Sequence, residues 1–191
     1  MKTEIKANST LRKLVECAIL MAMAVILNFL KINSFWALGG SITIVSMLPI
    51  LLAGYRHGIK WGVMTGVGYA VLQILLDIAQ ISSWGLTPII FIGTIALDYL
   101  LAYGGLSFAG LFCGKKNGLW LSSLVCLTWR YAMHFLSGII LFAEYDQVGF
   151  TPVTWSLAYN GSYMIPEIIL TTAVAFLISR IPSVNQKISN Q

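Results

Sequence analysis

Long apolar runs, separated by short polar connections, follow one another along this chain of 191 residues. A helix needs about 20 residues to cross a bilayer. On that basis the sequence predicts six spans, over residues 11–30, 42–55, 59–78, 86–112, 119–142 and 156–178. The second run is short and contains Pro49, so we expect it to be tilted, broken or partly re-entrant. The pattern predicts an all-α integral membrane bundle of six transmembrane helices, a single domain over residues 1–191 with short cytosolic tails at about 1–10 and 180–191.

Composition agrees with a membrane protein. Hydrophobic residues make up 58% of the chain and charged residues 10%, whereas a soluble domain has about 25% charged residues. The three cysteines, Cys17, Cys113 and Cys126, fall in apolar segments without CxxC or Cys/His ligand spacing. We therefore interpret them as core residues with no metal or redox role.

The basic residues indicate how the chain is oriented. Ten of the twelve lysines and arginines flank the predicted spans on the side that carries both termini. The positive-inside rule identifies that side as cytoplasmic, so the sequence predicts a multi-pass protein of the cell membrane with cytoplasmic N and C termini. The outer connections contain Asp77, Glu144 and Asp146 but only one base, Lys31. Such a mouth favours cations over anions.

Arg130 and His134 are the costliest side chains within the predicted spans. They are four residues apart, so they share one face of a helix. An arginine near the bilayer centre costs at least ~2.5 kcal/mol, and such a residue is normally kept where a cavity or a partner receives it. Counting about 1.5 Å per helical residue, we expect Asp98, Arg130 and Glu167 all to lie near the bilayer midplane.

The last predicted span carries a polar stripe on one face, because its polar residues follow helical spacing: Ser156, Asn160, Tyr163 and Glu167. Together with the face of Arg130 and the Asp98–Tyr99 pair, this stripe predicts an interior cavity that opens to the outside. Two carboxylates and one guanidinium leave one negative charge, which suits a monocationic ligand. Pairing of Arg130 with Glu167 as a purely structural contact is the alternative.

Aromatic residues gather at the outer ends of the predicted spans: Trp36, Trp84, Phe142, Tyr145, Phe150, Trp155 and Tyr159. Such rings can hold a flat organic cation, at ~1 to 2 kcal/mol for each good cation–π contact. The alternative is that they anchor the protein at the membrane interface, where tryptophan and tyrosine are enriched.

Three segments carry a resemblance to a known family: residues 97–112 (LDYLLAYGGLSFAGLF), 130–145 (RYAMHFLSGIILFAEY) and 155–167 (WSLAYNGSYMIPE). They resemble the bacterial ThiT/YuaJ family, the thiamine-specific S components of energy-coupling-factor (ECF) transporters. The likeness extends over essentially the whole chain. It implies a six-helix protein that binds thiamine from outside with high affinity and delivers it together with a transmembrane coupling subunit (T) and two ATPase subunits. It implies no cofactor in this chain, since ATP is used only by the partner subunits.

The resemblance also implies roles for individual residues. Asp98 matches the acidic residue that hydrogen-bonds the aminopyrimidine of the ligand, and Tyr99 matches its aromatic neighbour. His134 matches the family's histidine near the thiazolium, and Asn160 the pocket asparagine of the YNG motif. Arg130 occupies a basic position of the family.

Some positions depart from the family pattern. Asp98 is one methylene shorter than the glutamate of some members, so the ligand or a water must close that gap. Phe142 and Trp155 stand where other members carry Trp and Tyr, which keeps stacking but alters polar contacts. Trp36 is assigned to stacking on the pyrimidine, in a stretch that aligns only with a gap. Glu167 completes the set of predicted substrate-binding residues.

Small residues at helical spacing predict a contact with a partner. Ala18 and Ala22 form an AxxxA step in the first span, and Gly58, Gly62 and Gly66 form two GxxxG steps in the third. In the resembling family the alanine step contacts the coupling subunit, so we predict this role for Ala18 and Ala22. Packing inside the bundle is the alternative for the glycines.

Two other classes of function compete with this prediction. One is a stand-alone secondary transporter of a small organic cation, coupled to protons through Asp98 or Glu167. The lack of a detectable inverted repeat disfavours it, since many such transporters are built from repeats. The other is a membrane enzyme that uses His134 and a carboxylate as acid and base. No nucleophile, metal set or Walker motif accompanies them, so we predict that the chain is not an enzyme.

Overall fold

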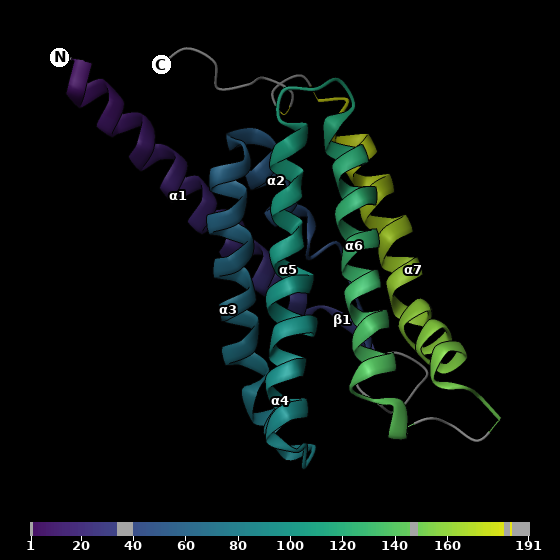
Figure 1. The fold of residues 1–191 in the computed structure, drawn as a ribbon. Coiled ribbons are helices and arrows are strands. Elements are labelled where there is room, and N and C mark those ends of the chain that lie inside the picture. Colours follow the sequence, from purple (N-terminus) through teal and green to yellow (C-terminus); the bar gives the residue numbers. More distant parts are fainter. Residues whose placement is uncertain (1, 34–39, 146–148, 182–183, 185–191) are drawn as a thin grey trace.

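The computed structural model describes residues 2–33, 40–145, 149–181 and 184, and within these residues the chain forms six helical rods (Figure 1). The rods are α1 (Lys2–Phe29), α2 (Leu48–His57), α3 (Ile59–Ser83), a composite rod, α6 (Gly118–Ile140) and α7 (Pro152–Ile178). The composite rod runs through α4 (Pro88–Thr94), the π-helical η1 (Ile95–Leu101), α5 (Ala102–Gly104) and the 3₁₀-helical η2 (Gly105–Phe112). A short 3₁₀ turn, η3 (Ala143–Tyr145), follows α6. The predicted all-α bundle is confirmed.

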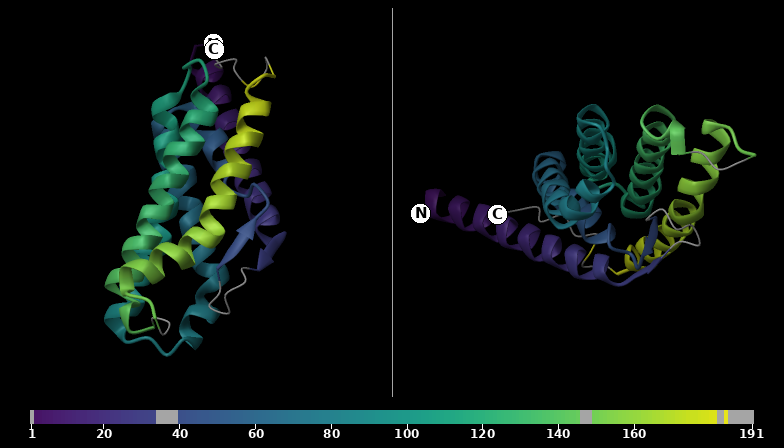
Figure 2. Two further views of the ribbon diagram at one scale, coloured as in Figure 1. Left: turned by 90° about the vertical axis from the view of Figure 1, so that its right-hand side faces the viewer. Right: turned by 90° about the horizontal axis from the view of Figure 1, so that it is seen from below.

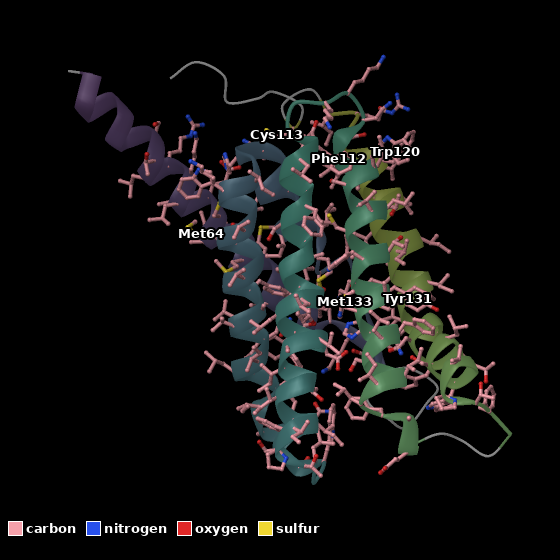
Figure 3. The ribbon with its side chains drawn as sticks, in the orientation of Figure 1. Met64, Phe112, Cys113, Trp120, Tyr131 and Met133 are labelled. Carbon is pink, nitrogen blue, oxygen red and sulfur yellow. The ribbon has the colours of Figure 1, made fainter. Side chains whose placement is uncertain are left out.

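Three of these segments are long and apolar enough to cross a membrane by length and composition: Ile59–Ser83, Pro88–Phe112 and Pro152–Ile178. Large apolar side chains are exposed along their outer faces, with Ile89 81% and Ile169 65% exposed. In Figure 3, outward-pointing side chains such as those around Met64 on α3 are mostly carbon, whereas nitrogen and oxygen atoms gather between the composite rod and α6. The protein therefore presents apolar surface outward and polar groups inward, as a multi-pass membrane protein does.

The helices enclose an interior on one side of the bundle. Viewed from below in Figure 2, α3, the composite rod, α6 and α7 form an arc, and α1 with the two short strands lies across its open side. The beginning of α1 and the end of α7 lie at the same end of the molecule (Figure 1). That arrangement agrees with an even number of crossings.

The first third of the chain differs from its prediction. α1 begins at Lys2, so the stretch expected to be a tail up to residue 10 is helical. This stretch contains Lys, Glu and Ala, which favour helix beyond the apolar run. The predicted second span is broken, as its length and Pro49 led us to expect: a strand, β2 (Ser41–Thr43), is followed by the short α2. Pro49 lies in the first turn of α2. Backbone N–H groups in the first turn have no acceptor within the helix, so the N–H that proline lacks costs no hydrogen bond.

β2 pairs with a second strand that the hydropathy pattern did not predict. β1 (Lys31–Asn33) and β2 run antiparallel, with Lys31 opposite Thr43 and Ile32 opposite Ile42. The chain between the strands, residues 34–39, lies outside the described part. The hairpin lies at the open side of the arc, against α7 (Figure 2).

The composite rod changes its helical geometry in the middle of its length. The Ala102 N–H donates to the carbonyl of Leu97, five residues back, which marks a π-helical turn. Such turns insert an extra residue into a helix and are frequent at functional sites. Asp98 and Tyr99 lie within this turn.

Close backbone contacts hold α2, α3 and η2 together. A Cβ atom on Gly110 would lie 2.4 Å from backbone atoms of Ile59, and one on Gly62 would lie 2.9 Å from the carbonyl oxygen of Ser107. Gly66 faces the same serine. Gly62 and Gly66 therefore pack inside the bundle. Ala18 and Ala22 lie on the exposed side of α1.

Candidate ligand-binding site

A cavity of about 510 Å³ opens between the helices and the hairpin. Small-molecule sites in proteins typically have volumes of about 300–1,000 Å³. The lining residues come from nearly every element: Asn28, Lys31, Gly40, Ser41, Thr43, Asp77, Gln80, Trp84, Leu86, Thr94, Asp98, Tyr99, Tyr103, Arg130, His134, Ser137, Gly138, Phe142, Trp155, Ser156, Tyr159, Asn160 and Tyr163. The sequence prediction of one interior cavity, shared by the last three spans, agrees with this geometry.

Asp98 is the best-held carboxylate on the cavity wall. Its Oδ1 lies 2.7 Å from Nδ1 of His134, and its Oδ2 accepts a hydrogen bond of 2.5 Å from the hydroxyl of Ser137. An ionised carboxylate only accepts, so we assign the ring proton to Nδ1. Each carboxylate oxygen keeps a second lone pair, and the side chain is 16% exposed. Asp98 can therefore accept a further hydrogen bond from a ligand without giving up either support.

Asp77 is a second carboxylate on the wall. It was predicted to lie in an outer connection, which is wrong because α3 continues to Ser83. The hydroxyl of Tyr99 donates to Asp77 Oδ2 at 3.1 Å. The π-helical turn thus presents two adjacent side chains, Asp98 and Tyr99, to partners on different helices. Tyr99 and Asp77 both line the cavity.

Arg130 lies on the wall at the buried side of the cavity. Its Nη2 donates to the hydroxyl of Tyr103 at 3.2 Å, and its guanidinium carbon lies 4.7 Å from the centre of the same ring. Nη1 is 3.6 Å from Oε1 of Glu167, which forms an ion pair. Glu167 is fully buried and is not among the lining residues. The structure therefore separates these two predicted site residues, since only Arg130 faces the cavity.

Asn160 lines the cavity but most of its amide is already bonded. Nδ2 donates to the carbonyl oxygens of His134 (3.2 Å) and Ser156 (3.0 Å), while Oδ1 accepts from the hydroxyl of Tyr163 (2.5 Å). The first of these bonds ties α7 to α6, and the other two lie within α7. Gly138 is required beside them, because a Cβ there would lie 2.2 Å from Oγ of Ser156.

The outer part of the cavity wall is aromatic. Trp155 and Tyr159 are stacked, with ring centres 5.8 Å apart and planes at 23°. Phe142 and Trp84, which both line the cavity, make an edge contact at 6.4 Å between ring centres. The backbone N–H of Gly40 donates to the hydroxyl of Tyr159 at 2.9 Å and so fixes the chain after residue 39 to α7. Trp36, the predicted stacking residue, lies outside the described residues.

The charges around the cavity nearly cancel. Three carboxylates and two cationic groups belong to the wall or pair with it, namely Asp77, Asp98, Glu167, Lys31 and Arg130. With His134 neutral they leave one formal negative charge. Among the described residues, no group of three His, Cys, Asp or Glu side chains is placed to hold a metal ion.

Several wall residues were not selected from the sequence. Tyr103 follows Tyr99 by four residues, and this spacing could have identified it. Thr43 and Lys31 lie in the hairpin, which the hydropathy pattern did not predict. Asp77 was missed because it was counted with the outer connections, although it lies within α3.

Comparison with known proteins gives one consistent result. The sequence model of a family described as "Thiamine transporter protein (Thia_YuaJ)" matches residues 14–186. The thiamine transporter ThiT of Bacillus subtilis (strain 168) is 32% identical over 182 residues, which cover 87% of this chain and 89% of that protein. A solved structure of ThiT from Listeria monocytogenes has the same fold, with a TM-score of 0.72 at 21% identity over 93% of this chain and 98% of that one.

Proposed function

The chain belongs to the thiamine transporter family Thia_YuaJ, and from this premise we propose that it is the thiamine-binding S component of an ECF importer. It binds thiamine on the outer side of the membrane and delivers it together with a coupling subunit and two ATPases. The observation that carries the proposal is Asp98, held by His134 and Ser137 on the wall of a cavity with an aromatic mouth. Transport is a non-enzymatic role, which removes the enzyme alternative.

The chemistry of thiamine fits this cavity. Thiamine joins a flat aminopyrimidine, which donates hydrogen bonds through its amino group, to a thiazolium ring that carries one positive charge. Asp98 has lone pairs left to accept from the amino group. The formal negative charge of the surroundings favours the cation, and aromatic rings favour its flat shape through stacking and cation–π attraction.

We assign the remaining contacts to the residues that the family resemblance marked. Trp155, Phe142 and Trp36 are the proposed stacking residues, with His134 beside the thiazolium. Asn160 acts mainly by holding α7 against α6, because its amide is already bonded within the protein. Glu167 is fully buried and does not line the cavity, so we propose that it lies behind the wall and does not contact the ligand.

Two features of the chain support the proposed partners: its sequence has no ATP-binding motif, and α1 has an exposed strip of small residues. Its sequence contains no Walker motif, so ATP hydrolysis must come from other subunits. Ala18 and Ala22 lie on an exposed strip of α1 beside Ile19 and Met23, which are 55% and 47% exposed. Small residues in such a strip allow a second helix to approach closely. We propose that the coupling subunit packs here and that both termini are cytoplasmic.

A proton-coupled transporter that works alone is the second candidate. It is favoured by the contact between Asp98 and His134, since a carboxylate beside a histidine can exchange a proton. Uptake by proteoliposomes separates the two. An S component takes up thiamine only when the coupling subunit, the ATPases and ATP are present, whereas a proton-coupled carrier takes it up alone and stops when the proton gradient is collapsed.

Binding itself is tested by titrating the purified protein with thiamine while recording tryptophan fluorescence. Trp84 and Trp155 line the cavity, so a stacked ligand should quench their emission and the signal should saturate at one thiamine per chain. Choline, a small cation without an aromatic ring, is the control and should neither quench nor compete. Equal responses to thiamine and choline would contradict the proposal.

A further inference from the structure

Glu167 is a fully buried carboxylate with an unusual setting. It is 0% exposed and lies behind the cavity wall. Oε1 accepts a hydrogen bond of 2.6 Å from the hydroxyl of Thr43 and lies 3.6 Å from Nη1 of Arg130. Oε2 has no hydrogen-bond partner among the described residues. A buried carboxylate is costly unless its charge is compensated, and Arg130 is the cation beside it.

Arg130 is the neighbour that faces the ligand site. Its side chain is 8% exposed, and Glu167 is the carboxylate with which it forms an ion pair. Among the described residues, its hydrogen bond and its cation–π contact are with a neutral group, the hydroxyl and the ring of Tyr103. Without Glu167, the guanidinium of Arg130 would have no ion-pair partner among the described residues. Glu167 therefore decides how positive the buried side of the cavity is.

Thr43 fixes the position of the carboxylate. A hydroxyl has one proton, and since Thr43 donates it to Glu167, Oγ of Ser46 must donate to Thr43 across their 2.6 Å contact. Ser46, Thr43 and Glu167 are all buried. The carboxylate is thus held between the hairpin and α6, and it keeps the guanidinium against Tyr103.

We propose that Glu167 determines the charge selectivity of the cavity as a positioning residue, without touching the ligand. By neutralising and orienting Arg130, it makes the cavity favour a simple cation over a related ligand that also carries a phosphate. This inference rests on the proposed binding of thiamine. The two ligands that report on it are thiamine and thiamine monophosphate, which differ only in the phosphate.

The test measures the dissociation constants of both ligands for the wild type, for Glu167→Gln and for the double variant Glu167→Gln/Arg130→Met. Glutamine keeps the size of the side chain and an acceptor for Thr43 but removes the charge. A charge about 10 Å from a ligand charge changes its binding about tenfold at an effective dielectric constant near 20. In Glu167→Gln the preference for thiamine over the monophosphate should fall about tenfold, and the double variant should regain the wild-type preference.

Thr171→Val is the matched control. Thr171 lies four residues after Glu167 on α7, is fully buried and has no hydrogen-bond partner among the described residues. This variant should keep the wild-type preference. If Glu167→Gln does not fold, Arg130→Met alone serves, and its preference for thiamine should rise.

Three results would overturn the inference while leaving thiamine binding intact. These are an unchanged preference in Glu167→Gln (or in Arg130→Met, where that variant serves), an equal change in Thr171→Val, or a double variant that stays as altered as the single one. A wild-type protein that binds neither ligand would instead refute the proposed function.

Discussion

The two halves of the helix bundle hold together by different means. In the lower half of Figure 1, where α4, η1, the hairpin and the lower parts of α6 and α7 surround the cavity, hydrogen bonds hold polar side chains such as Asp98 and Asn160. In the upper half, where α2, α3 and η2 meet, glycines such as Gly62 and Gly110 bring backbones into contact. From this difference we expect substitutions in the lower half to change ligand affinity and substitutions in the upper half to change stability.

The largest effect on affinity is expected from Asp98→Asn. The substitution removes the charge and replaces one acceptor oxygen by an NH2 group. That NH2 group would face either Nδ1 of His134 or the hydroxyl of Ser137, which both bond to the carboxylate in the wild type. Charge-assisted hydrogen bonds in a desolvated site are strong, so the dissociation constant for thiamine should rise more than tenfold. Calorimetric titration measures it. An unchanged affinity would mean that thiamine binds elsewhere, and Thr171→Val provides a variant with an intact site.

Gly110→Ala should lower stability and leave thiamine affinity nearly unchanged, in contrast to Asp98→Asn. The new Cβ would lie 2.4 Å from the backbone of Ile59, and overpacking of this kind costs about 1–3 kcal/mol of stability. The thermal unfolding midpoint should therefore fall. The affinity of the folded protein for thiamine should stay within about twofold of the wild type, which is a smaller free-energy change than this loss of stability.

Gly104→Ala is the control on the same rod, because nothing lies within 4 Å of its Cβ position. An alanine there should leave the unfolding midpoint unchanged or raise it. If Gly110→Ala were as harmless as Gly104→Ala, the upper half would not depend on close backbone contact.

Ala22→Trp should have the smallest effect on binding, because Ala22 belongs to neither half and lies on the exposed side of α1. Thiamine affinity of the isolated protein should stay at the wild-type value. ATP-dependent uptake with the partner subunits should be lost, because an indole prevents a second helix from approaching closely. Loss of binding in the isolated protein would show instead that this face packs internally.

The parts of the molecule that follow helical periodicity were predictable from sequence. Apolar runs located the spans, and the spacing of Arg130 and His134 placed both on one face toward an interior site. The stripe from Ser156 to Glu167 likewise predicted which face of α7 turns inward. Glu167 itself is buried behind the cavity, since periodicity gives the face of a helix but not how deep the cavity reaches.

Features set by tertiary contacts were not predictable in this way. The π-helical turn that carries Asp98 was not predicted, since the apolar run from residue 86 to 112 shows no composition that distinguishes a π turn from an α-helix. The hairpin contains only three residues in each strand, which is too short for an alternating pattern. The amide of Asn160 joins α7 to α6 through the carbonyl oxygen of His134, and the residue type alone does not indicate which partner it has.

The most direct test of the account is a structure of the protein determined with thiamine bound. We expect the amino group of the pyrimidine about 2.7–3.2 Å from a carboxylate oxygen of Asp98, with the rings of the ligand among Trp155, Phe142 and His134. A ligand bound outside this cavity, or bound within it without contact to Asp98, would contradict the account.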